Sequence, residues 1–182
     1  MDDVNQRILQ QRAKRLAQKS VQNDEIPLEM VLINVAGEQY ALELTRLKAV
    51  MPADIAVLPL APRTVAGIMN VRGEIVSVLD LAALLKFERD EKAVASVVLA
   101  DTKYGSIGLR IDGVPELFSA YLSQLTPALA GRDAVQGVFN RRIKPEAVAS
   151  KLNVSRLEVD QEYRISPVAW LDIDVLCGGL DL

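Results

Sequence analysis

The segment from Gly67 to Leu81 constrains the fold of this chain more than any other, because a tight chain reversal is followed there by an apolar run that ends at an aspartate. Its Asn-x-Arg-Gly motif is expected to end a helical turn, and Gly73 can adopt the positive φ that a tight reversal needs. The residues of Ile75–Leu79 are mostly β-branched or bulky, which predicts a strand buried on both faces. Asp80 is then expected to cap the N-terminus of a short helix. The segment therefore predicts a hairpin followed by a capped helical turn.

Short strands separated by turns are predicted along most of the chain. From Glu29 on, the apolar runs are short and are bounded by glycine, proline and polar turn residues. Prolines between residues 52 and 62 exclude a long helix there, and Asp112-Gly113 is typical of a hairpin turn. The expected strands are 30–35, 39–43, 75–79, 92–101, 104–112 and 114–118, with a helical turn at 44–48 and short helices at 81–86 and 145–152.

A weak internal repeat joins the two halves of the chain. The string Gly67-Ile-Met-Asn recurs as Gly137-Val-Phe-Asn, and the apolar run before Asp80 recurs before Asp172. Coincidence is the alternative for strings this short, but their common order and their common ending at an aspartate favour a duplicated β unit. The second copy lacks the Arg-Gly turn and carries an insertion over residues 141–164.

The composition is that of a globular chain without a nucleic-acid or membrane signature. Half of the 182 residues are hydrophobic, a quarter are charged, and the formal net charge is −3. Basic residues do not alternate with aromatic ones in any stripe, and the apolar runs are shorter than a membrane span. The N-terminus shows no export signal, and the lone Cys177 has no disulfide partner within the chain. These features predict a soluble cytoplasmic protein that binds no nucleic acid and does not insert into a membrane.

The absence of histidine removes most catalytic and metal-binding chemistry. Neither a Ser-His nor a Cys-His couple can form, and the commonest metal ligand is missing. No phosphate-binding glycine loop or dinucleotide-binding motif occurs. The candidate acids Asp80, Asp101, Asp112 and Asp172 each stand where a cap or a turn explains them. We therefore expect a non-enzymatic protein with no cofactor and no metal, and a carboxylate-dependent hydrolase is the least favoured alternative.

Residues 1–28 differ from the rest of the chain in charge and pattern. Between Val4 and Gln22 there are five cations and no acid, and small apolar residues recur at helical spacing. This pattern predicts a basic amphipathic helix followed by a linker. The helix either lies solvated on the body of the protein or docks to an acidic partner, and both alternatives stay open at this point.

Three motifs together resemble the CheW-like domains of bacterial chemosensory systems. The first is Gly-Ile-x-Asn-x-Arg-Gly, which starts at Gly67 and leads through an apolar strand to Asp-Leu. The second is the Leu-Pro-x-x-Pro element that starts at Leu58. The third is a run of small and apolar residues that ends in Asp-Gly-Val at residues 112–114. The resemblance extends from about Glu29 to the C-terminus.

The resemblance implies a fold and a function. Members of this family form two five-stranded SH3-like β-barrels side by side, so residues 29–182 are expected to form one CheW-like domain of two intertwined barrel subdomains. Family members do no chemistry; they bind both the cytoplasmic hairpin tip of a chemoreceptor and the regulatory domain of a CheA-type histidine kinase. Because the chain has no phosphotransfer histidine, it resembles the stand-alone adaptor, here of an auxiliary pathway and associated with receptors at the inner face of the membrane. A regulatory binding module outside receptor arrays is the alternative.

The lip of the predicted hairpin is the first expected partner-binding site. It consists of Asn70, Arg72 and Gly73, and Arg72 is the cation that could bind a carboxylate of a partner in bidentate geometry. A surface arginine paired with a carboxylate of its own chain is the alternative.

The second expected site is an apolar groove between the two barrels, which would hold the receptor tip. By position relative to the strands of the family, Leu44 and Leu47 line one wall and Ile107 and Ile111 line the other. Ordinary core packing is the alternative for each of the four residues.

Overall fold

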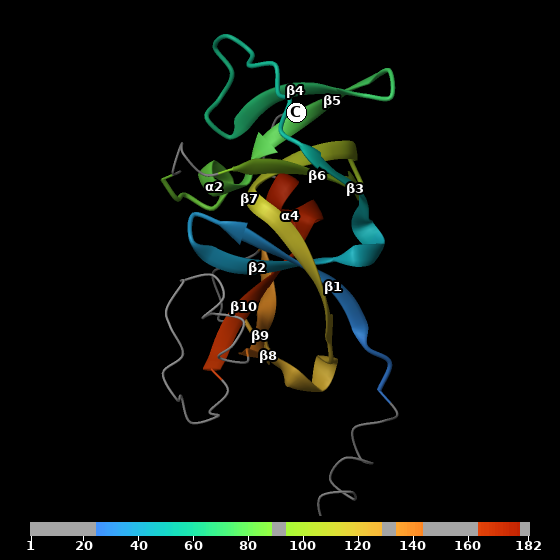
Figure 1. Ribbon diagram of the computed structural model, residues 1–182, viewed down its shortest axis with the longest axis vertical. Coiled ribbons are helices and arrows are strands. Elements are labelled where there is room, and N and C mark those ends of the chain that lie inside the picture. The colour runs from blue at the N-terminus through green and yellow to red at the C-terminus, as the bar shows by residue number, and fades with distance from the viewer. Residues whose placement is uncertain (1–24, 89–93, 129–133, 144–163, 179–182) are drawn as a thin grey trace, which may run out of the picture.

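Strands dominate the computed structural model, which describes residues 25–88, 94–128, 134–143 and 164–178 (Figure 1). The strands are β1 (Leu28–Val35), β2 (Glu38–Glu43), β3 (Leu47–Pro52), β4 (Val65–Val71), β5 (Glu74–Asp80), β6 (Ala95–Thr102), β7 (Gly105–Ala120), β8 (Leu125–Pro127), β9 (Val135–Ile143) and β10 (Arg164–Leu171). The helical elements among the described residues are η1 (Leu44–Arg46), α2 (Leu81–Leu84), η2 (Leu122–Gln124) and α4 (Ile173–Cys177). The mainly β class is thus confirmed. The helices expected between residues 4 and 22 and at 145–152 lie outside the described residues.

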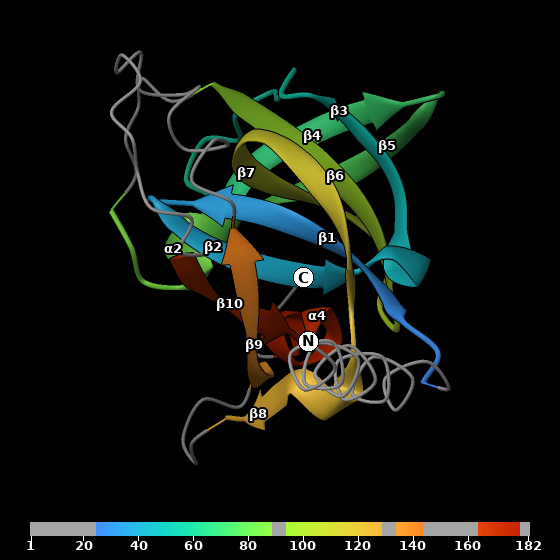
Figure 2. The same cartoon turned by 60° about the horizontal axis from the view of Figure 1, so that its bottom comes forward.

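All of these strands belong to one hydrogen-bonded sheet. Its order is β3-β6-β7-β1-β2-β10-β9-β8, and the β4–β5 hairpin joins where β5 lies beside β7. Neighbouring strands are antiparallel except in two places, where β5 runs parallel to β7 and β10 runs parallel to β2. Figures 1 and 2 show that the sheet is strongly curved, with β4 and β5 toward one end of the molecule and β8 and β9 toward the other.

The order of elements repeats along the chain. The succession β1-β2-η1-β3-β4-β5-α2 matches β6-β7-η2-β8-β9-β10-α4, which confirms the duplicated unit expected from the sequence. The hairpin that opens each repeat pairs with the other repeat, because β2 lies beside β10 and β7 lies beside β5. We call β3 to β7 the first strand group, and β1, β2 and β8 to β10 the second strand group. That each group is an SH3-like barrel stays a prediction; the structure joins both groups in one sheet.

Both expected aspartate caps are present. The Asp80 carboxylate accepts a hydrogen bond of 3.1 Å from the backbone N–H of Ala83 at the start of α2. The Asp172 carboxylate accepts bonds of 2.9 and 3.1 Å from Asp174 and Val175 at the start of α4. Each cap satisfies N–H groups that have no partner in the first helical turn. Two helices of only four and five residues therefore begin at the positions that the sequence repeat predicts.

Two local expectations for the β4–β5 hairpin differ from the structure. The residues before the Asn-x-Arg-Gly motif form strand β4 and not a helical turn, because they pair with β5 as far as Val71 opposite Glu74. Strand β5 is buried on both faces only near its end, where the consecutive residues Val78 and Leu79 are both fully buried. Nearer the turn Val76 is buried but Ile75 is 65% exposed. Because successive side chains of a strand alternate between its faces, this part of the hairpin covers the core with one face and leaves the other open.

The expected turn at Asp112-Gly113 is also wrong, because β7 continues through it. Gly113 has a φ of +69° and donates its backbone N–H to Val94 at 2.6 Å. The register between β1 and β7 shifts next to it, between Leu32 and Asn34. The positive φ therefore produces a bulge that bends one long strand. Before the bend β7 pairs with β6, and beyond it β7 pairs with β1 alone among the described strands.

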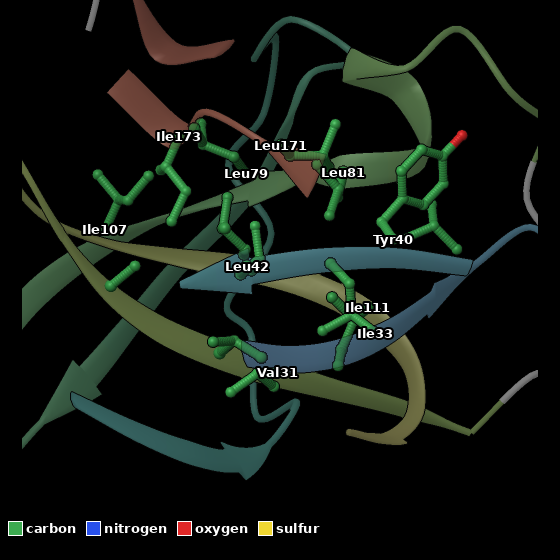
Figure 3. Packing of buried hydrophobic residues seen from close by; sticks show 14 of the residues in the cluster. Val31, Ile33, Tyr40, Leu42, Leu79, Leu81, Ile107, Ile111, Leu171 and Ile173 are labelled. Atoms are coloured by element: carbon green, nitrogen blue, oxygen red, sulfur yellow. The ribbon is translucent and has the colours of Figure 1, made fainter. Parts of the chain in front are cut away.

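The largest hydrophobic cluster is shared by both repeats (Figure 3). Its side chains come from β1, β2, β5, β6, β7, β10 and both α helices and lie toward one another. Those labelled in Figure 3 are Val31, Ile33, Tyr40, Leu42, Leu79, Leu81, Ile107, Ile111, Leu171 and Ile173. Smaller clusters lie around Met30 and Phe139 in the second strand group and around Met69 and Val97 in the first. Because the main cluster draws on both repeats, burial of apolar surface stabilises them together.

Gly67 allows the first strand group to close. The backbone of Ala56 exchanges hydrogen bonds of 2.8 and 2.9 Å with Ile68, the neighbour of Gly67, and so connects the segment after β3 to β4. Gly67 has a φ of +146°, and a Cβ atom there would meet the Ala56 carbonyl oxygen and lie 2.8 Å from Cγ2 of Ile55. A side chain at this position would therefore strain the backbone and also prevent the close approach.

We expect Gly67→Ala to lower the free energy of unfolding by about 2–4 kcal/mol, because backbone strain and overpacking act together. Gly37→Ala is the matched control, since Gly37 also has a positive φ of +84° but no atom lies within 4 Å of its Cβ position. The control should lose about 1 kcal/mol from backbone strain alone. Chemical denaturation of both variants measures the difference. Equal losses in the two variants would show that the approach of Ala56 does not need a glycine.

Candidate partner-binding surface

The lip of the β4–β5 hairpin is a tight turn with two consecutive left-handed residues. Arg72 has a φ of +53° and Gly73 a φ of +94°, and Val71 pairs with Glu74 across the turn. Two positive φ values in this register are those of a type I′ turn, which matches the twist of the two strands. The Asn70 side-chain oxygen accepts a 2.8 Å hydrogen bond from the backbone N–H of Gly73. The positive φ expected for Gly73 is confirmed.

Arg72 occupies this turn in an exposed position. No ion pair joins its guanidinium to any residue in the part of the chain that the structure describes, so the pairing within the chain is not seen there. A non-glycine residue in the left-handed region costs about 1 kcal/mol or more, and such strain is common at functional positions. The turn thus presents a guanidinium, with all its donors directed to solvent or to a partner.

The open face of the hairpin places an apolar side chain beside this lip. Asn70 pairs with Ile75 and Ile68 pairs with Ser77 across the two strands, so these four residues share the face that the core does not cover. Ile75 is largely exposed. The lip therefore offers a binding partner two kinds of contact. The exposed isoleucine provides an apolar surface, and the asparagine and arginine beside it provide hydrogen bonds, those of the arginine being charged.

The structure does not bring the four expected residues together as the walls of an apolar groove. Ile107 and Ile111 are 4% and 1% exposed and belong to the shared core, so the assignment of these two residues to a groove wall is corrected. They are buried because β7 is a central strand with β6 and β5 on one part of its length and β1 on the other. Leu44 and Leu47 are partly buried at the edge of the same core. A partner could therefore contact these two leucines but neither isoleucine.

A small polar pocket lies beside η1, where the two repeats meet. Its volume is about 110 Å³, and it opens between η1 and the segments β9, β10 and α4. The lining residues are Glu43, Arg46, Gln136, Trp170, Leu171, Asp172, Ile173 and Asp174. No local motif predicts this pocket, because Arg46 and Asp174 are 128 residues apart in the sequence. The opposite charges of Arg46, at the end of η1, and Asp174, in the first turn of α4, are the one signal that could have suggested it.

The two aspartates of this pocket already have structural partners. Asp174 accepts a 2.8 Å hydrogen bond from the backbone N–H of Lys103 and forms an ion pair with Arg46. The hydrogen bond from Lys103 and then the Arg46 guanidinium hold the pKa of Asp174 below its usual value. Asp172 caps α4 with one oxygen and accepts from the Gln136 side chain at 2.8 Å with the other. A general acid needs a raised pKa, so this pocket gives no support to the hydrolase alternative.

Neither a metal centre nor a membrane-spanning helix can be identified within the described ranges. No three carboxylate or cysteine side chains gather there in a way that could hold a metal ion. Among the same residues, every helix is too short or too polar to cross a bilayer.

Comparisons with known proteins agree on one family. The model of the CheW-like domain matches residues 29–161. The chemotaxis protein CheW of Thermotoga maritima is 29% identical over 87 residues, which are 47% of this chain and 58% of that protein. The chemotaxis protein CheW of Rhizobium meliloti is 24% identical over 101 residues, which are 54% of this chain and 65% of that protein. The matched regions thus span less than two thirds of these relatives.

The fold is similar to that of a solved scaffolding protein. The crystal structure of TtCheW from Thermoanaerobacter tengcongensis superposes with a TM-score of 0.66 over 86% of this chain and 95% of that one, at 18% sequence identity. At this identity the likeness concerns the fold alone. The family match, in contrast, covers well over half of the sequence and includes both the hairpin lip and the bend in β7. On this basis the chain belongs to the CheW-like domain family.

Proposed function

We propose that this protein is a non-enzymatic adaptor that couples chemoreceptors to a CheA-type histidine kinase. It would act in the cytoplasm, at the inner face of the membrane, and bind the hairpin tip of a receptor and the regulatory domain of the kinase at the same time. Membership of the CheW-like family is the observation that carries this proposal. We assign the adaptor to an auxiliary chemosensory pathway, because the basic segment before Glu29 and the insertion at 141–164 depart from a minimal adaptor.

The surface supports a binding role. The curved sheet buries one shared core and leaves the hairpin lip and the edge beside η1 as places where a partner can bind. At the lip, the Arg72 guanidinium is free to form two parallel hydrogen bonds with a partner carboxylate. The Asn70 hydrogen bond holds the turn that presents it. Binding residues placed on short turns of a rigid scaffold are typical of recognition surfaces.

The proposal is tested by the binding of both partners to one molecule. The full chain is mixed with the regulatory domain of the CheA-type kinase and with a receptor-tip fragment, both taken from the same genome, and each pair and the ternary mixture are measured by calorimetry and by size-exclusion chromatography. We expect binding to each partner and a complex that contains all three proteins. Failure to bind either partner, or strict competition between the two, would contradict the coupling function.

We expect Arg72→Ala to weaken the binding of one of these partners by about 1–3 kcal/mol, the range for a charge-assisted hydrogen-bonded pair that becomes buried. The free energy of unfolding should hardly change, because no described residue pairs with Arg72. Arg72→Lys keeps the charge but loses the planar fork, so it should restore only part of the affinity. Calorimetric titration of the variants measures these differences.

Arg63→Ala is the matched control for Arg72, because Arg63 is an exposed arginine on the loop that leads into β4. Its removal changes the net charge by the same amount but should leave affinity nearly unchanged. If Arg63→Ala and Arg72→Ala weaken binding equally, the effect comes from the overall charge. If Arg72→Ala lowers stability and leaves both affinities intact, Arg72 has a structural role.

We expect Leu47 to contact the receptor tip from the edge of the core. Leu47→Ala should weaken receptor-tip binding by about 1–2 kcal/mol, since it removes apolar contact without burying a charge. Val50→Ala is the control, because Val50 lies on the exposed face of the same strand, β3. Leu47→Asp should abolish the binding in a protein that still folds by circular dichroism. Intact receptor-tip binding by a folded Leu47→Asp protein would remove Leu47 from the site.

A further inference from the structure

The last helix of the second repeat is fastened by polar contacts at the edge of the first strand group. Asp174, in the first turn of α4, accepts from the backbone of Lys103, which lies in the turn between β6 and β7. Its other oxygen forms the ion pair with Arg46 of η1. The Arg46 and Asp174 side chains keep 38% and 24% of their surface exposed. These contacts are thus close to water, where an ion pair contributes little and can open readily.

The two repeats differ at this position. When Asp80 and Asp172 are placed in register as the two caps, Ala82 of α2 corresponds to Asp174 of α4. Ala82 is 1% exposed and lies in the shared core. The first repeat therefore holds its helix at this position by apolar packing, and the second holds its helix by a hydrogen-bonded ion pair.

Apolar residues of α4 nevertheless lie in the core. Ile173 is buried, and Cys177 is 1% exposed. At the end of the helix, Gly178 lies against Tyr104, whose hydroxyl would be 3.1 Å from an added Cβ. A helix of five residues is too short to be stable in water without such contacts. Its position therefore depends on the core packing beneath it and on the Asp174 contacts at its edge.

We propose that α4 is a latch, which undocks from the first strand group as a local unit while the rest of the fold stays intact, and that Asp174 sets how often it opens. Opening would withdraw Asp174 from Arg46 and Lys103, expose Ile173 and Cys177 to solvent, and remove one wall of the pocket beside η1. Local openings of this kind involve segments with few contacts and a small buried surface.

The chain contains its own probe of this motion, because Cys177 is its single cysteine. In the docked state burial raises the pKa of the thiol to about 11, and Asp174 adds to this shift, so alkylation should be slow. Iodoacetamide is added in large excess to the purified full chain, under conditions where the rate is proportional to reagent concentration. The alkylation rate then reports the equilibrium population of the open state.

Three variants separate the contacts of Asp174. Asp174→Ala removes both and should speed alkylation by roughly three- to tenfold, the fold-change expected for losing a charge-assisted hydrogen bond near the surface. Asp174→Asn keeps an oxygen for the Lys103 N–H but loses the ion pair, and Arg46→Met removes the same ion pair from the other side; both should give smaller and similar increases. Glu74→Gln is the control, since Glu74 is exposed at the turn of the β4–β5 hairpin and is not part of the contacts of α4. It changes the charge equally and should leave the rate unchanged.

Dilute urea distinguishes local opening from global unfolding. The wild-type alkylation rate should be nearly insensitive to urea below the unfolding transition, because a five-residue helix exposes little surface. A rate that rises with the full denaturant dependence of global unfolding would overturn the latch. Equal rates for wild type, Asp174→Ala and Glu74→Gln would show that Asp174 does not control opening. The test uses the isolated protein, so its result does not depend on whether the adaptor function is correct.

Discussion

The exchange of hairpins between the two repeats is the constraint on which the rest of this structure depends. Each repeat contributes an opening hairpin, β1–β2 or β6–β7, that pairs in parallel with the capped strand of the other repeat. Parallel neighbours need a long connection, and here the intervening elements of the chain provide it. The shared core lies where these strands meet, so neither half can bury its apolar side chains alone.

This interlocking leaves few places where a partner can bind. Pairing along the sheet satisfies most backbone groups of its strands. The β4–β5 hairpin projects from this body with one face open, and its turn holds Arg72 in a strained conformation that the Asn70 hydrogen bond supports. The junction of the repeats beside η1 is the second such place, and polar residues from both halves line it. This arrangement supports the adaptor function proposed above.

The candidate site could be predicted in part, and the failures have a physical cause. Asn70 and Gly73 follow from the requirements of a tight turn, which act over three residues. Ile107 and Ile111 have the same apolar character whether they line a groove or fill a core, and the neighbours of β7 decide between the two. The contact of Asp174 with Arg46 has no local signature, because the whole fold brings these residues together.

The sequence by itself determined the elements whose causes are local. Strands β1, β2 and β6, the tight turn at Gly73 and the aspartate caps follow from interactions between residues a few positions apart, and these expectations agree with the structure. Tertiary structure decided which strands pair, that β7 bends at Gly113 instead of turning back, and that one face of β5 stays open near its turn. Those outcomes depend on register and closure across the entire sheet, where the gain from a shared core outweighs the preference of any single segment.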